Sequence, residues 1–217
     1  MHILYHDAAV AVCVKPVGAE CERELPALLA QALGGRAEDF FCVHRLDRVV
    51  GGVMVYARTA KSAAALSLET QQRTLQKEYL AVCAGVPEPP EGELRDWLYR
   101  DSVKARAYVV KAQRRGVKEA VLSYRTLAAA PLETGSAALL RVQLHTGRFH
   151  QIRCQLAARQ HPLLGDGKYG SRVSGCTVAL WSASLAFRHP LSGETLRFSA
   201  PPPAAFPWTL FDEEHFT

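Results

Sequence analysis

Short apolar runs separated by glycine, proline and charged residues make up the N-terminal part of the chain, and runs of this length predict buried strands. They lie just before a turn at Asp7 and at residues 10–14, 40–43, 53–57 and 77–84. Two stretches favour helices instead. Leucines recur at helical intervals over residues 24–33, and residues 61–72 are rich in alanine and end in glutamines.

The rest of the chain continues this mixture. Proline, glutamate and glycine concentrate at residues 85–96, which predicts a surface loop. Thr146 is placed to cap a helix over residues 148–159, with Phe149, Ile152 and Leu156 on its core-facing side. Further strands are predicted at 105–110, 121–130, 137–145 and 178–187, the last followed by a hairpin turn at 191–193 and a proline-rich tail.

These elements lack the regular strand and helix alternation of a doubly wound sheet, which favours an α+β fold with a mixed, mostly antiparallel sheet. A length of 217 residues suits one domain, which we expect to cover residues 1–217. An apolar content of 48% with 22% charged residues is ordinary for globular proteins and excludes disordered and fibrous classes. No run approaches the roughly 20 apolar residues of a membrane span, and residues 8–14 lack the basic lead-in of a secretory signal.

Cysteines are scattered along the chain without a CxxC pair or a histidine at zinc-finger spacing, so no metal site is expected. Most of them stand inside apolar runs, as small core residues do. We expect all of them to be reduced, which indicates a cytoplasmic protein. They are Cys13, Cys21, Cys42, Cys83, Cys154 and Cys176.

Positive charge is concentrated in one part of the chain. Residues 100–172 hold 14 Lys and Arg against 4 acidic residues, whereas the remainder holds 12 basic against 17 acidic residues. Clustered cations gain free energy by releasing the counterions condensed on a phosphate backbone, so this asymmetry is typical of a nucleic-acid-binding surface. A solvated basic face is the alternative that charge alone leaves open.

The tetrad His44-Arg45-Leu46-Asp47 stands between two apolar runs, with Gly51 and Gly52 just beyond it. An arginine and a carboxylate delivered between buried strands lie near the edge of the core, where a charge must be paired or used. The tetrad is therefore either a buried ion pair or a catalytic site. Arg153 poses a similar question, because it borders the apolar side of its predicted helix and needs an acidic partner unless it snorkels to solvent.

Four ordered segments, Lys15-Pro16, HRLD at 44–47, KEYLAV at 77–82 and TGRFHQIR at 146–153, resemble the RluA family of RNA pseudouridine synthases. The resemblance covers residues 3–200 and implies the pseudouridine synthase fold, a mixed and mostly antiparallel sheet with helices and loops around an RNA-binding cleft. Because the pattern begins at residue 3, we expect a catalytic domain without the accessory S4 domain of some relatives. The implied activity is isomerisation of a specific uridine in rRNA or tRNA.

The resemblance also assigns residues. Asp47 matches the catalytic aspartate, Arg45 the arginine that replaces the flipped nucleotide in the helix, and Tyr79 the aromatic that packs on the target base. Arg153 matches the arginine that pairs with the catalytic carboxylate. Elementary chemistry agrees, since breaking a glycosidic bond without hydrolysis needs an aimed, ionised and poorly hydrated carboxylate, and a paired base must be flipped out to be reached. Neither a metal nor an organic cofactor is required.

Several other residues have weaker assignments. Lys15 matches a lysine of the family and is either structural or a phosphate contact. His44, His145 and His150 are better explained by structural hydrogen bonds than by acid–base roles, and we interpret Gly165-Asp166 and Tyr169-Gly170 as architecture. Contacts to the RNA backbone are predicted for Arg148 and for the basic residues Lys104, Arg106, Lys111, Arg114, Arg115 and Lys118, whose alternative is a solvated hairpin.

Two positions depart from the family pattern. Val50-Gly51-Gly52 stands where many relatives have Thr-Ser-Gly, and Phe149 stands where Thr or Ser is usual, so hydroxyl groups near the site are lost. The leading hypothesis remains an RNA uridine isomerase that acts as a monomer. Its alternative is a non-catalytic RNA-binding or RNA-folding factor on the same scaffold, whereas a glycosidase is disfavoured because Asp47 has no second carboxylate in an evident partner motif.

Overall fold

The computed structural model describes residues 1–133 and 135–216, and these form two compact units. The first unit comprises Met1–Glu78 and Trp181–Pro202, and the second comprises Tyr79–Leu180 with the tail from Pro203 onward. The expectation of one catalytic domain over residues 1–217 stays a prediction. The fold itself is confirmed as α+β with largely antiparallel strand pairing.

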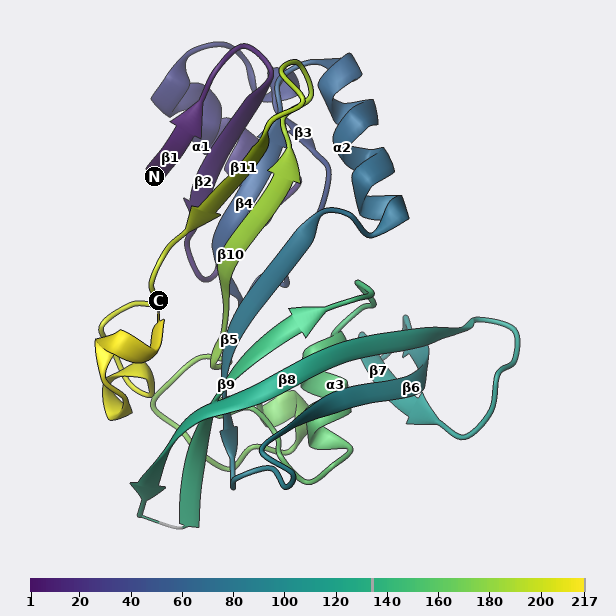
Figure 1. Cartoon of the computed structure of the whole chain (residues 1–217), viewed down its shortest axis with the longest axis vertical. Helices are drawn as coiled ribbons and strands as arrows, with labels where there is room; N and C mark the ends of the chain where they lie inside the picture. The colour runs from purple at the N-terminus through teal and green to yellow at the C-terminus, as the bar shows by residue number, and fades with distance from the viewer. Residues whose placement is uncertain (134, 217) are drawn as a thin grey trace. The chain divides into compact units, whose positions relative to one another are not determined.

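The first unit is a twisted sheet with two helices (Figure 1). Its strands are ordered β1, β2, β4, β10, β11, and β3 also pairs with β4. Neighbouring strands among the described residues of this unit pair antiparallel, except that β4 and β10 are parallel, with Gly51 and Gly52 opposite Trp181 and Ser182. The elements are β1 (His2–His6), β2 (Val10–Lys15), α1 (Glu24–Leu33), β3 (Phe41–Cys42), β4 (Gly51–Ala57), α2 (Ala60–Gln72), β10 (Leu180–Arg188) and β11 (Thr195–Ser199).

Alternating residues of these strands build the core of the first unit. One face of the sheet buries an apolar cluster that includes Val10, Val55 and Phe187 and is covered by Leu66 of α2. Thr59 caps α2 by accepting a hydrogen bond from the Ser62 amide at 3.1 Å, which satisfies one of the free amides at the start of a helix. The predicted helices and strands of this unit are confirmed, and α1 has the predicted bounds.

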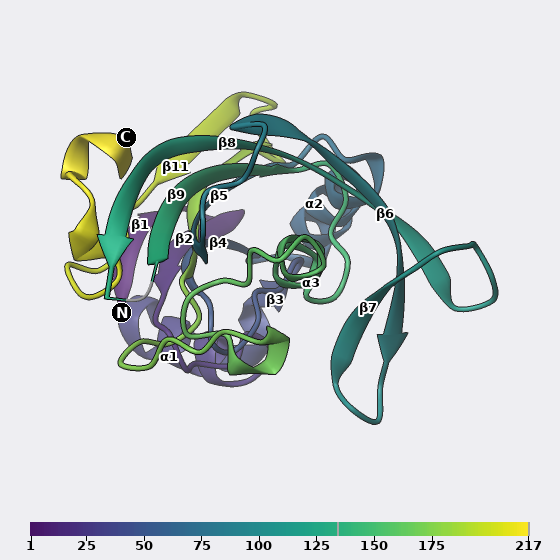
Figure 2. The same ribbon diagram turned by 90° about the horizontal axis from the view of Figure 1, so that it is seen from below.

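The second unit is a curved sheet that holds one helix (Figure 2). Its strands are ordered β5, β9, β8, β6, β7, with antiparallel pairing of β9 with β8, β8 with β6 and β6 with β7. Figure 2 shows α3 on the concave side of the long strands β8 and β9. The elements are β5 (Gln76–Ala84), β6 (Glu91–Asp101), β7 (Arg106–Val110), β8 (Val117–Leu132), β9 (Gly135–Leu144) and α3 (Gln151–Ala157).

Two predictions in this unit are wrong. The loop predicted for residues 85–96 is shorter, because β6 already begins at Glu91 and pairs with β8. The predicted helix over residues 148–159 is also shorter and Thr146 does not cap it. His150 is the residue before the first turn, with a φ of 51°, and it makes no side-chain capping bond.

The cysteine prediction is confirmed in part. All six thiols are free; Cys13, Cys21, Cys83 and Cys154 are buried, and Cys42 and Cys176 are half-buried. Burial raises the pKa of each of these thiols, which keeps them protonated. Within the described ranges, no helix combines the length and the apolar character that crossing a lipid bilayer requires.

Candidate active site

Asp47 lies in the turn that connects β3 to β4, with a half-buried side chain. Its backbone carbonyl accepts a hydrogen bond from the Val50 amide at 2.9 Å, which closes the turn. The turn precedes a strand that is buried along its whole length. A carboxylate on such a turn is anchored through its backbone while its side chain keeps contact with solvent.

Lys15 supports this turn from within the core. Its side chain is fully buried, and Nζ donates to the carbonyls of Pro16 at 3.1 Å, Arg48 at 3.1 Å and Val50 at 2.7 Å. An ammonium group has three protons to donate, so these carbonyls use its full capacity. Burial lowers the pKa of Lys15, and the negative charge of Asp47 is among the groups that oppose this shift. Of the two roles that the sequence left open for Lys15, the structure favours the structural one over a phosphate contact.

His44 and the glycines after the tetrad are architectural. His44 is buried and its Nε2 accepts a hydrogen bond from the Val55 amide at 3.2 Å, so the preference for a structural hydrogen bond is confirmed. Desolvation holds the pKa of His44 well below its usual value, which keeps the ring neutral. A Cβ on Gly52 would overlap the carbonyl oxygen of Ser182, so a glycine is needed where β10 runs close beside β4.

Arg45 projects to the surface of the first unit. Its side chain is 63% exposed and Nη1 contacts a carboxylate oxygen of Glu22 at 3.2 Å. An exposed pair of this kind contributes about 0–1 kcal/mol, so the guanidinium can leave it at little cost. Exposure and easy release suit the predicted insertion of Arg45 into RNA, which stays a prediction.

Arg153 occupies the middle of α3, where residues 151–156 are all buried. Its Nε donates to Oδ2 of Asp166 at 2.6 Å and its Nη2 to Oδ1 at 2.9 Å, in a two-pronged ion pair. The two side chains are only 5% and 1% exposed. The guanidinium carbon also lies 5.2 Å from the centre of the Tyr169 ring. Asp166 and Tyr169 are thus the architecture expected for this loop, and Asp166 is an acidic partner that sequence analysis did not assign to Arg153.

The predicted pairing of Arg153 with Asp47 joins residues of different units and stays a prediction. The same holds for the predicted contact of Tyr79 with the target base. Tyr79 is a buried residue of β5, 5% exposed, in the second unit. The structure therefore groups Asp47, Arg45 and Lys15 in the first unit, and Tyr79 and Arg153 in the second.

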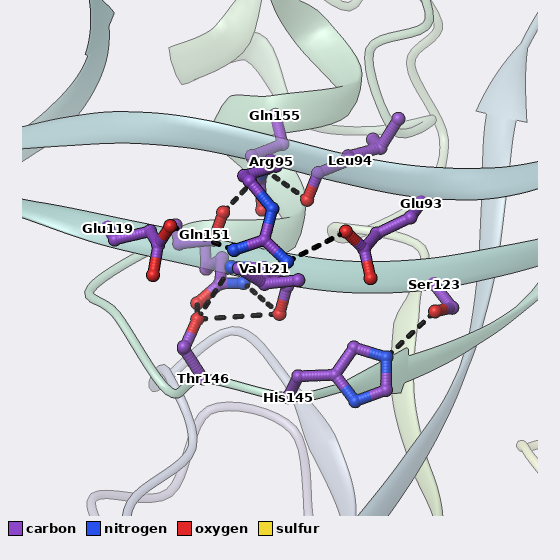
Figure 3. A network of polar contacts seen from close by, with 11 residues as sticks. Glu93, Leu94, Arg95, Glu119, Val121, Ser123, His145, Thr146, Gln151 and Gln155 are labelled. Carbon is purple, nitrogen blue, oxygen red and sulfur yellow. Dashed lines mark hydrogen bonds and ion pairs between the residues drawn. The ribbon is translucent and has the colours of Figure 1, made fainter. Parts of the chain in front are cut away.

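A polar network fixes the turn that leads into α3 (Figure 3). Thr146 donates to the Gln151 side-chain oxygen at 2.8 Å, and the Arg148 amide donates to the same oxygen at 3.0 Å. The Thr146 hydroxyl and the Gln151 amide group also bond to the backbone of Val121 on β8. Gln151, the first residue of α3, thereby ties the preceding turn and β8 to the helix that carries Arg153.

Basic and aromatic side chains cluster on the β6–β7 hairpin and the turn before α3. Lys104 is exposed in the hairpin turn, Arg106 lies 5.0 Å from the Tyr169 ring centre, and Arg148 donates to the Glu119 carbonyl at 2.8 Å. Arg100 lies 4.4 Å above the centre of the Phe149 ring, so Phe149 offers a cation–π contact at this position. His145 bonds Ser123 and His150 bonds Tyr169, which confirms the structural hydrogen bonds preferred for both histidines.

Lys77 is the first residue of the KEYLAV segment, and it is half-buried. Its side chain makes no ion pair or hydrogen bond among the residues that the structure describes. Desolvation lowers its pKa to about 8. The unfolded chain then binds more protons than the folded chain between about pH 8 and 10.5, so Lys77 makes stability rise with pH in that window and costs stability below it.

We expect Lys77→Met to raise the free energy of unfolding at pH 7 by about 2 kcal/mol, less than the full pKa shift would give because solvent screens a half-buried group. The rise in stability above pH 8 should shrink by the same amount. Urea unfolding at pH 7 and pH 10 measures both effects. Lys61→Met, on the exposed side of α2, is the control and should change neither. An equal response of the two variants would contradict the prediction.

Comparison with known proteins identifies the family of the chain. The sequence profile of the RNA pseudouridylate synthase family matches residues 9–158, a stretch that contains Asp47, Tyr79 and Arg153. The chain belongs to this family, whose members are isomerases that convert uridine to pseudouridine in RNA. The resemblance to the RluA family is thereby confirmed.

Curated relatives are similar over most of the chain. An uncharacterised RNA pseudouridine synthase of Aquifex aeolicus is 31% identical over 95% of this chain and 71% of its own length. The ribosomal large subunit pseudouridine synthase D of Vibrio cholerae is 36% identical over 74% of this chain, but only 52% of its own length is matched. The chain thus spans about half of several relatives.

Solved structures share the fold. Human RNA pseudouridylate synthase domain containing 4 superposes with a TM-score of 0.76 and 25% identity, over 93% of this chain and 88% of that one. Human RNA pseudouridylate synthase domain containing 1 gives a TM-score of 0.80 at 21% identity, over 93% of this chain and 83% of that one. The pseudouridine synthase fold is therefore confirmed.

Proposed function

We propose that this chain converts a specific uridine of ribosomal RNA to pseudouridine, with Asp47 as the catalytic carboxylate. The observation that carries the proposal is the anchored turn of Asp47, which fully buried Lys15 holds through the carbonyls of Arg48 and Val50. Aiming a reactive group depends on a rigid backbone beneath it, and here the backbone is tied to a buried cation. Relatives from Vibrio and Neisseria are named ribosomal large subunit pseudouridine synthases, which favours large-subunit ribosomal RNA over transfer RNA as the substrate.

The remaining residues have distinct roles in this proposal. Asp47 attacks the nucleotide at the ribose C1′ or the uracil C6, after which the base detaches, or it abstracts a ribose proton so that the base leaves as a glycal forms. The base then rotates and rejoins the ribose through C5; C5 loses its proton and N1 gains one, so the product is an isomer of the substrate. Tyr79 packs on the flipped base, and base–aromatic stacking contributes about 1–3 kcal/mol. Arg153, oriented by Asp166, keeps the catalytic carboxylate ionised. Arg45 fills the gap that the flipped base leaves, since a planar guanidinium stacks on bases and bonds their edges.

The basic part of the chain supports contacts to the RNA backbone. Lys104 is exposed and Arg106 and Arg148 are half-buried, all in the second unit. Cations of this kind position a nucleic acid without reading its sequence. We further propose that the enzyme acts as a monomer in the cytoplasm, where its six free thiols stay reduced, and that neither a metal nor a membrane takes part.

The proposal is tested by mapping pseudouridines. Purified protein is incubated with large-subunit ribosomal RNA and with total transfer RNA, both from cells that lack the gene. Carbodiimide labelling followed by primer extension then locates each pseudouridine. We expect one or a few new sites in the ribosomal RNA. New sites in transfer RNA alone would contradict the proposal that ribosomal RNA is the substrate. The absence of new sites in both RNAs would contradict the proposed activity.

A further inference from the structure

The Cys21 thiol forms hydrogen bonds with Leu46, the residue that precedes Asp47. Cys21 lies between β2 and α1 and is 3% exposed. Its Sγ lies 3.2 Å from the Leu46 carbonyl oxygen, and the Leu46 amide donates to the same sulfur at 3.4 Å. One thiol thus satisfies both backbone groups of one buried residue. We infer that Cys21 is a positioning residue for Asp47, an inference that rests on the proposed function.

The bond to the Leu46 carbonyl acts on Asp47 directly. That carbonyl belongs to the peptide unit that joins Leu46 to Asp47, and a peptide unit is planar and stiff. Holding the carbonyl oxygen of Leu46 therefore fixes the orientation of the peptide plane that ends at the Cα of Asp47. Lys15 holds the turn on the other side of Asp47, through the carbonyls of Arg48 and Val50. The backbone is therefore held both before and after Asp47.

Cys21 is itself held in place. Its carbonyl accepts a hydrogen bond at 2.7 Å from the hydroxyl of Tyr56, a fully buried residue of β4. Its sulfur also contacts the sulfur of Met54, another β4 residue, at 3.7 Å. The segment before α1, the Asp47 turn and the strand that follows the turn are thereby joined through one side chain.

Few side chains could replace the thiol. The position needs one small group that donates to a carbonyl and accepts from an amide at once, which only a thiol or hydroxyl does in so little space. An aliphatic residue would fill the volume but leave two buried backbone groups unsatisfied. Cys42 helps in the same way, because its thiol donates to the His44 carbonyl at 3.1 Å. A buried thiol and a half-buried thiol therefore hold the tetrad, at Leu46 and at His44.

The test compares Cys21→Ala with Cys21→Ser and with the control Cys13→Ala. Cys13 is a fully buried thiol of β2 in the same unit, and no hydrogen bond of its side chain is found in the described residues, so its truncation reports the cost of a cavity alone. We expect Cys21→Ala to lower kcat about tenfold with an unchanged KM for RNA, because small misplacements of a reacting group are costly. Cys21→Ser should recover most of this loss, and Cys13→Ala should change kcat by less than about twofold.

Exchange of the Leu46 amide hydrogen provides a readout that does not depend on activity. It should be faster in Cys21→Ala than in wild type and unchanged in Cys13→Ala. Equal kcat values for the two alanine variants, or unchanged Leu46 exchange in Cys21→Ala, would overturn the positioning role. If the wild-type protein forms no pseudouridine, the proposed function fails instead, and the exchange measurement still decides whether Cys21 holds the turn.

Discussion

We expect Asp47→Asn to abolish pseudouridine formation. The substitution keeps the size and the backbone of the turn but removes the negative charge on which each mechanistic route depends. Loss of a reacting side chain of this kind lowers kcat on the order of 10⁴-fold or more. Primer extension after carbodiimide labelling, with single-turnover amounts of enzyme, measures the remaining rate on the RNA that the wild-type protein modifies.

The affinity for RNA should change little in this variant. Most of the binding free energy comes from phosphate contacts, and a carboxylate contributes none of them. Asp39→Asn is the matched control, because Asp39 is a partly exposed carboxylate of the same unit whose bonds are to Arg36. It should retain full activity. If Asp47→Asn restores the function of the missing gene in cells while forming no pseudouridine, the alternative of a non-catalytic RNA-binding factor is correct.

Elements with strong local patterns could be predicted from sequence alone. The helix over residues 24–33 has leucines at helical spacing, and its bounds are correct. Strand β6 was missed because its first half reads Glu-Gly-Glu-Leu-Arg-Asp after two prolines. Its apolar residues Leu94 and Leu98 are buried, and its outward residues form exposed ion pairs such as Glu93 with Arg95. Only pairing with β8 makes this segment a strand.

Polar contacts in the site also depend on residues that are distant in the sequence, so sequence alone could not predict them. Local sequence pointed to Asp47 and Arg153 as charges that need a use or a partner. It could not show that Lys15 serves backbone carbonyls of residues 48 and 50, because a main-chain acceptor leaves no mark in the sequence. Nor could it choose Asp166 as the partner of Arg153, since several carboxylates were equally available along the chain. Contacts between residues that are far apart in the sequence can be identified only from the structure.

Removing the carboxylate of Asp166 should destabilise the protein more than any other single charge change discussed above. Asp166→Ala takes the two-pronged partner from a guanidinium that is 5% exposed. Breaking a buried ion pair from one side typically costs about 3–5 kcal/mol, because a buried charge loses its compensation. Urea unfolding at pH 7 measures the loss. Glu93→Ala removes a carboxylate from an exposed pair with Arg95 and should cost less than about 1 kcal/mol.

Replacing both Arg153 and Asp166 separates the role of Arg153 in the buried ion pair from its proposed role beside the catalytic carboxylate. In Arg153→Met/Asp166→Leu no charge is left to compensate, and apolar replacements of a buried pair are often neutral or stabilising. The double variant should therefore be more stable than Asp166→Ala while pseudouridine formation stays low, because Arg153 is lost from the site. Recovered activity would show that the cation is needed only to complete the fold. Stability no better than that of Asp166→Ala would show that the pair is required for packing around α3 as well as for charge balance.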